Sequence, residues 1–150
     1  MNHSFGSWDP SVAAEFIGKW EGCRLDAYRC PAGVWTVGYG HTAGVTAGMT
    51  ISQEQADAWL VEDIAKAQRE LAKFVNVPVT RGQFIALVSL AFNVGANYVI
   101  RRCPRLMRAV NAGDIDAAAY EFLDINRAGG VVLEGLTRRR KAEAALFLGE

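Results

Sequence analysis

A glutamate placed to act as a general acid is followed by a cysteine and a threonine near the N-terminus. Glu21 ends an apolar, helix-like stretch, and Cys30 and Thr36 follow nine and fifteen residues later. The intervening sequence, within EGCRLDAYRCPAGVWTVGYGHT, is rich in glycine, aromatic and β-branched residues, which favour strands and turns. A hairpin that starts after Gly22 would bring Cys30 and Thr36 back toward Glu21.

The position of Glu21 suits a general acid. The C-terminal end of a helix carries partial negative charge, and apolar neighbours such as Trp20 also disfavour a carboxylate. Both effects favour the protonated carboxyl group, which can donate a proton to a leaving group. Each residue also has a simpler interpretation: Glu21 as a surface glutamate, Cys30 as a small buried residue and Thr36 as a strand former.

The elements that must position these residues are a first helix and a small hairpin. Asp9 can cap a helix whose first turn contains Pro10 and whose end is at Gly22. Residues 24–46 contain four glycines and the run VWTVGYG. This composition predicts a small hairpin sheet, with Gly33 at its turn.

From residue 52 onward the pattern is helical. Ser52 and Thr80 each precede a glutamine by three residues, which is the spacing of a capping box, and each should open a long helix. Further helices are predicted at CPRLMRAVNAG, after Asp114 and across LEGLTRRRKAEAALFLG, with NRAGG as a loop. We therefore expect an α+β, mostly α fold, with a β lobe at about residues 24–50 and a helical lobe at residues 1–23 and 52–150. The cleft should lie between the lobes.

Composition and charge exclude several classes of protein. The 150 residues are 51% hydrophobic and have a formal net charge of zero, which is typical of a globular domain rather than a disordered chain. Three cysteines without paired spacing argue against a disulfide framework and against a zinc site, so we expect no metal and no cofactor. The C-terminal half is net basic, but too weakly to indicate nucleic acid as a partner.

The stretch from Glu21 to Thr42 resembles the signature of the phage-type lysozymes, the muramidase endolysins of glycoside hydrolase family 24. In that family a glutamate, eight residues, an aspartate or cysteine, five residues and a threonine form the catalytic triad. Glu21, Cys30 and Thr36 match this spacing. The resemblance extends over residues 11–147 through GMTISQEQADAWLVEDIAKA, QFIALVSLAFNVG and GLTRRRKAEAALF. It implies one lysozyme-like catalytic domain over residues 1–150.

The resemblance implies hydrolysis of the β-1,4 bond between N-acetylmuramic acid and N-acetylglucosamine in peptidoglycan. Glu21 would protonate the leaving oxygen. Cys30 stands where many members have aspartate, and a free thiol is mostly uncharged at neutral pH unless a cation such as Arg24 or Arg29 lies close. Two mechanisms follow: Cys30 acts as a thiolate nucleophile or base, or Cys30 and Thr36 orient a water molecule. We favour the second.

The same resemblance assigns roles to four other residues. It implies a structural pair between His41 and Asp63 near the site, rather than catalysis by His41. It places Phe92 on the cleft wall and Asn126 near the substrate. The basic run Arg138–Lys141 is either a solvated face or a surface that attracts the anionic wall.

Two other functions fit the same residues. A lytic transglycosylase also needs an acid but forms an anhydro sugar, and a non-catalytic wall-binding domain would have lost its second carboxylate. For an endolysin we expect a monomer that neither binds nucleic acid nor inserts into a membrane. The N-terminus lacks the pattern of a signal peptide. We therefore expect the chain to stay in the host cytoplasm until a separate pore, a holin, gives it access to the wall.

Overall fold

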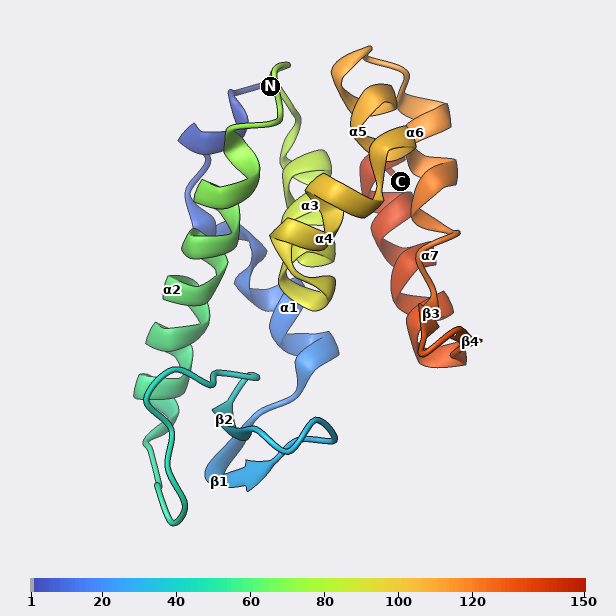
Figure 1. The fold of residues 1–150 in the computed structure, drawn as a ribbon. Coiled ribbons are helices and arrows are strands. Elements are labelled where there is room, and N and C mark those ends of the chain that lie inside the picture. Colours follow the sequence, from blue (N-terminus) through green and yellow to red (C-terminus); the bar gives the residue numbers. More distant parts are fainter. Residues whose placement is uncertain (1) are drawn as a thin grey trace.

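The computed structural model describes residues 2–150, and its fold is mostly helical with a small antiparallel hairpin, as predicted (Figure 1). Only Met1 of the predicted helical lobe lies outside the described residues. In chain order the elements are η1 (Phe5–Ser7), η2 (Pro10–Ala13), α1 (Ala14–Glu21), β1 (Arg24–Arg29), β2 (Trp35–Gly38), α2 (Gln53–Ala72), α3 (Arg81–Val94), α4 (Ala96–Arg102), α5 (Pro104–Asn111), α6 (Ile115–Phe122), β3 (Arg127–Ala128), β4 (Val131–Val132) and α7 (Glu134–Leu148).

The first helix places Glu21 at its last position. The Asp9 side chain accepts a hydrogen bond from the backbone N–H of Ser11 at 2.9 Å, as a capping residue should. The predicted helix starts as the 3₁₀ turn η2 and continues as α1. The helix ends at Gly22, whose φ of 70° lies outside the helical range. Glycine suits this position, because an L side chain rarely adopts that backbone conformation.

The hairpin of β1 and β2 returns the chain to the end of α1. Tyr28 pairs with Thr36, and Arg24 pairs with Gly38, so the open end of the hairpin lies next to the residues that follow Glu21. The turn contains Gly33 with φ of 81°, as predicted. On the α2 side, a Cβ atom added to Gly38 would lie 3.4 Å from that of Ala56, which shows how closely β2 packs on α2.

Helix α3 forms the centre of the helical lobe and lies between α2 and α7 (Figure 1). Its residues from Gln83 to Ala91 are all buried. Its N-terminus carries a complete capping box between Thr80 and Gln83. A Cβ atom at Gly82 would lie 2.4 Å from the Leu146 carbonyl oxygen, so glycine permits the close approach of α3 and α7.

Two elements differ from the sequence prediction. Helix α4 was not predicted, because its seven residues follow Gly95 directly and are too few to show a helical period. The NRAGG segment, predicted as a loop, instead forms the small ladder of β3 and β4. Gly129 and Gly130, both with positive φ, supply its two-residue turn.

No single helix within residues 2–150 has the length and hydrophobicity needed to cross a membrane. Helices α3 and α4, bent by 99° relative to each other, meet the criteria only when taken together, by length and composition.

Candidate functional site

The Glu21 carboxylate is held by an arginine from the other end of the chain. Its Oε2 atom lies 2.6 Å from Nη1 of Arg139 on α7. The two side chains are 19% and 5% exposed, respectively. Glu21 therefore sits in a partly buried ion pair and does not face bulk solvent.

Arg139 is itself fixed by α3. Its Nη2 atom donates to the carbonyl oxygen and to the hydroxyl of Ser89, at 3.3 and 3.2 Å. Its Nε atom lies 3.4 Å from Glu143 Oε2, and the Ser89 hydroxyl donates to the same carboxylate oxygen. Because the other donors of the guanidinium are occupied, Nη1 is directed at Glu21.

A second arginine on α7 completes this cluster. Arg140 and Glu143 are fully buried, and Nε of Arg140 lies 2.9 Å from Oε1 of Glu143. Another guanidinium nitrogen of Arg140, Nη2, donates to Oδ1 of Asn93. Burial raises the pKa of Glu143 and lowers the pKa of Arg140, because desolvation disfavours charge, and the attraction between the two groups opposes both shifts.

The interpretation of residues 138–141 as one basic surface is wrong for two of its four members. Arg138 and Lys141 are exposed, but Arg139 and Arg140 are buried in ion pairs. The reason is the helical period: positions 139, 140 and 143 share the face of α7 that packs on α3.

Cys30 and Thr36 lie together on the hairpin. Thr36 is buried, and its hydroxyl donates to the Val34 carbonyl oxygen at 2.9 Å. The pKa of the Cys30 thiol is lowered, chiefly by hydrogen bonding to the backbone of Val34 and then of Ala32. The hairpin turn therefore favours the thiolate.

Neither arginine that the sequence offered as a cationic neighbour of Cys30 accounts for this lowered pKa. The guanidinium of Arg24 stacks on the Tyr28 ring, 4.1 Å from its centroid. That of Arg29 lies 5.2 Å from the centroid of the Trp35 ring. Both side chains make cation–π contacts, and the polarisation of Cys30 comes from backbone groups instead.

The hairpin approaches Glu21 through Gly40. A Cβ atom at Gly40 would lie 3.4 Å from Oε1 of Glu21, so a larger residue would crowd the carboxylate. Among residues 2–150 the carboxylate hydrogen-bonds to Arg139 and to neither Cys30 nor Thr36. Thr36 precedes Gly38 by two residues on β2, a span of roughly 7 Å. The three residues therefore do not form a contact triad, and neither Cys30 nor Thr36 is among the residues that line the two cavities near Glu21 and Gly40.

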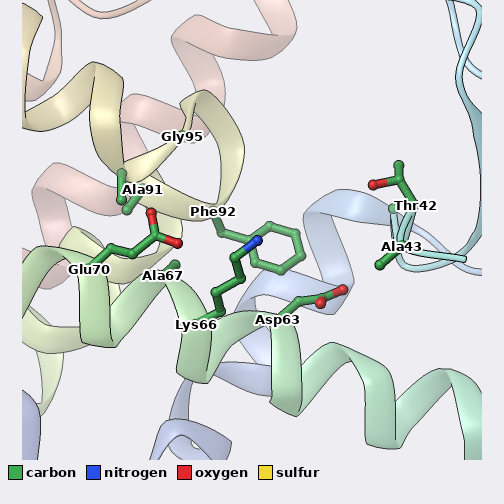
Figure 2. Close-up of a pocket in the computed structure, with 11 residues that line it drawn as sticks. Thr42, Ala43, Asp63, Lys66, Ala67, Glu70, Ala91, Phe92 and Gly95 are labelled. Carbon is green, nitrogen blue, oxygen red and sulfur yellow. The ribbon is translucent and has the colours of Figure 1, made fainter.

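Glu21 and Gly40, which approach each other, line two different cavities. One, of about 460 Å³, is lined by Glu21 together with Trp20, Asn93, Leu133, Gly135, Leu136, Arg138 and Arg139. The other, of about 300 Å³, is lined by Gly40, Thr42, Asp63, Lys66, Phe92 and neighbouring residues. Figure 2 shows the α2 side chains of Asp63, Lys66 and Glu70 in this second cavity, with Phe92 beside them and Thr42 opposite. Phe92 therefore lies on a cavity wall.

The predicted contact between His41 and Asp63 is formed. Nδ1 of His41 lies 2.7 Å from Oδ2 of Asp63, and Nε2 lies 3.0 Å from the Ala43 carbonyl oxygen. The imidazole also stacks on Trp59 at 4.3 Å between ring centroids. Both ring nitrogens and a face of the His41 imidazole are thus engaged in contacts within the protein, which fits a positioning role for His41.

Asn126 is not among the residues that line either cavity, but its carbonyl oxygen accepts a hydrogen bond from the N–H of Leu133, which lines the cavity at Glu21. Its Nδ2 atom donates to the Thr137 hydroxyl at 3.0 Å, which ties the segment before β3 to the first turn of α7. The residues that sequence reasoning missed are Ser89, Asn93, Arg139 and Glu143. The sequence held a signal for Arg139 and Glu143. Both are charged residues at helical spacing in a segment that also has to bury Ala144 and Phe147.

Comparisons with known proteins agree over most of the chain. The family model described as phage lysozyme matches residues 18–143. The endolysin of Acyrthosiphon pisum secondary endosymbiont phage 1 is 43% identical over 135 residues, which cover 87% of this chain and 91% of that protein. The SAR-endolysin of Haemophilus phage HP1 is 34% identical over 148 residues, covering 92% of this chain and 80% of that protein. The muramidase domain of SpmX from Asticaccaulis excentricus has a TM-score of 0.83 and 35% identity, covering 91% of this chain and 95% of that one.

Proposed function

Because this chain belongs to the phage lysozyme family and is an endolysin acting on peptidoglycan, we propose that it hydrolyses the β-1,4 bond between N-acetylmuramic acid and N-acetylglucosamine. The observation that carries this proposal is the placement of Glu21. Its partly buried carboxylate lines the cavity of about 460 Å³ and approaches Gly40, which lines the other cavity, and a buried arginine fixes one of its oxygens. A glycan strand lying along both cavities would pass directly over it.

In the proposed reaction the two oxygens of Glu21 have different roles. Oε2 accepts from Arg139 and is anchored. Oε1 faces Gly40 and has no hydrogen-bond partner among the described residues, so it is the oxygen that would carry the proton to the leaving glycosidic oxygen. The carboxylate that remains stabilises the positive charge that develops on the sugar, and it takes up the proton that the attacking water releases, which restores the acid.

Cys30 and Thr36 are proposed to position the attacking water. The Thr36 hydroxyl already donates its proton to Val34, so its remaining capacity is to accept a hydrogen bond, for example from water. A Cys30 thiol with a lowered pKa is also an acceptor when ionised. The alternative in which this thiolate is itself the nucleophile or base is tested by the Cys30 variant discussed below.

Phe92 and Asn126 remain proposed substrate contacts. Phe92 can pack against a sugar ring from its cavity wall. Asn126 would act through its Oδ1 atom, because its Nδ2 atom is bound to Thr137. Activity of Phe92→Ala and Asn126→Asp on glycan fragments of increasing length would show whether either residue contributes to binding.

Digestion of purified peptidoglycan tests the proposal. Hydrolysis leaves muropeptides with reducing ends, whereas a lytic transglycosylase leaves anhydro ends, and mass spectrometry distinguishes the two. A Glu21→Gln control should release product at least about a hundredfold more slowly. Anhydro ends from the wild-type protein would replace the hydrolase proposal with the transglycosylase.

We further propose that the chain acts as a monomer and reaches the wall through a separate pore. Two relatives, from Haemophilus phage HP1 and Escherichia phage P1, carry the designation SAR-endolysin, so this route needs its own experiment. Host cells would express the chain with and without a holin. Lysis that requires the holin supports the pore, and equal lysis without it argues for an export route of the chain's own.

A further inference from the structure

We propose that Asn93 is a further substrate-contacting residue, whose side-chain Nδ2 donates a hydrogen bond to a carbonyl or hydroxyl oxygen of the glycan beside Glu21. This inference rests on the proposed function, because it assigns a second contact in the same cavity. Asn93 lies in the last turn of α3, and it lines the cavity of about 460 Å³ together with Glu21 and Trp20.

The orientation of the Asn93 amide follows from its partner. Nη2 of Arg140 lies within hydrogen-bond distance of the amide, and a guanidinium can only donate. The atom that faces Arg140 must therefore be the carbonyl oxygen Oδ1. Because the amide is planar, the two hydrogens of Nδ2 are left for another acceptor.

The groups that hold Asn93 are buried and paired. Arg140 is fully buried and is paired with Glu143 at 2.9 Å. Ser89, one helical turn before Asn93 on α3, contacts Arg139 in a similar way. Thus two successive positions on one face of α3 contact two successive arginines of α7. One arginine holds the Glu21 carboxylate and the other holds the Asn93 amide.

The Nδ2 atom has no hydrogen-bond partner within residues 2–150, although Asn93 is half-buried. A polar donor that is partly removed from water and left unpaired costs free energy. In an open cavity, water occupies that donor until a ligand oxygen replaces it. The acetamido carbonyls and hydroxyls of a peptidoglycan glycan are acceptors of this kind.

The test uses Asn93→Asp, which keeps an oxygen for Arg140 but removes the donor. Asn93→Leu removes the donor without adding charge, and Asn97→Asp, at an exposed position on α4, is the matched control. Initial rates are measured on purified peptidoglycan and on the same material after chemical de-N-acetylation. We expect both Asn93 variants to lose roughly three- to tenfold in kcat/KM, the size of one neutral hydrogen bond, and Asn97→Asp to match the wild type.

The pH profile separates a lost donor from an added charge. Loss of the donor lowers the rate across the whole pH range, whereas added charge shifts the optimum in Asn93→Asp alone. If the defect disappears on de-N-acetylated substrate, the acceptor is an acetamido carbonyl; if it persists, the acceptor is a hydroxyl. Wild-type rates in either Asn93 variant, or a defect confined to a shifted optimum, would overturn the inference. An inactive wild-type protein would instead refute the proposed function.

Discussion

Arg139 on the last helix holds Glu21 at the end of the first, with 2.6 Å between Nη1 and Oε2 across a separation of 118 residues. The pair lines the cavity of about 460 Å³, and Gly40, which lines the other cavity, approaches Oε1 of the same carboxylate. The position of the proposed acid therefore depends on how α7 packs on α3, and not only on the local signature around Glu21.

Replacing Arg139 by methionine should reduce both stability and activity. Removing one partner of a buried ion pair leaves an uncompensated charge, which costs roughly 3–5 kcal/mol, or a Tm lower by about 10 °C for a chain of this size. Thermal unfolding monitored by circular dichroism measures this change. Arg138→Met is the matched control, because Arg138 is 65% exposed and its pair with Glu134 should contribute less than about 1 kcal/mol. Equal Tm values for the two variants would contradict the structural role of Arg139.

Glu143→Gln should also destabilise the protein by roughly 3–5 kcal/mol, because two buried guanidinium groups would lose their shared carboxylate. Denaturant unfolding gives the free energy directly. The double change Arg140→Met with Glu143→Leu removes the Arg140 pair completely and should recover part of the loss, since apolar replacement of a buried ion pair is often neutral. A double variant less stable than Glu143→Gln would show that the pair itself contributes net stability.

Cys30→Ser should keep at least about a tenth of wild-type lytic activity if Cys30 and Thr36 orient water, because a serine hydroxyl can also accept a hydrogen bond. Turbidity of outer-membrane-permeabilised cells measures the rate. Cys23→Ser is the control for changing a thiol next to the hairpin, since the Cys23 thiol donates to Oε1 of Gln53 at 3.9 Å. A folded but inert Cys30→Ser would instead establish the thiolate as nucleophile or base.

The two thiols whose pKa is shifted should react with alkylating agents at different pH. Hydrogen bonding to the Val34 backbone lowers the pKa of Cys30, whereas burial raises the pKa of Cys103. Since only the thiolate reacts, the alkylation rate of Cys30 should rise at a lower pH than that of a free cysteine, and Cys103 should react only at higher pH. Peptide mass mapping after timed iodoacetamide treatment reads both sites. A Cys30 profile at or above that of free cysteine would contradict the hydrogen-bonded turn.

Much of the frame around the site was predictable from local signals. Asp9 and Gly22 fixed the limits of the first helix, and the glycines and β-branched residues after it predicted the hairpin. Thr80 and Gln83 predicted the start of α3. Ser52 caps α2, because its hydroxyl accepts a hydrogen bond from the backbone N–H of Gln55 at 3.1 Å. Between these two described residues, the reciprocal hydrogen bond of a full capping box, from the Ser52 backbone N–H to the Gln55 side chain, is not formed. These features depend on neighbours within a few residues.

The electrostatics of the site were not predictable in the same way. Four basic residues in succession suggest a solvated or wall-binding surface, and only the packing of α7 on α3 shows that Arg139 and Arg140 point inward. Asn93 contacts Arg140 across 47 residues of sequence, and Ser89 contacts Arg139 across 50. No local pattern encodes such a pairing.

The most direct test of the central claim, that the carboxylate of Glu21 drives hydrolysis of the glycan, is mass spectrometry of muropeptides from purified peptidoglycan digested by the wild-type protein and by Glu21→Gln. We predict reducing-end products from the wild type. The variant should fold and bind peptidoglycan but release product at least about a hundredfold more slowly. Reducing-end products released by Glu21→Gln at a rate near that of the wild type would contradict the claim.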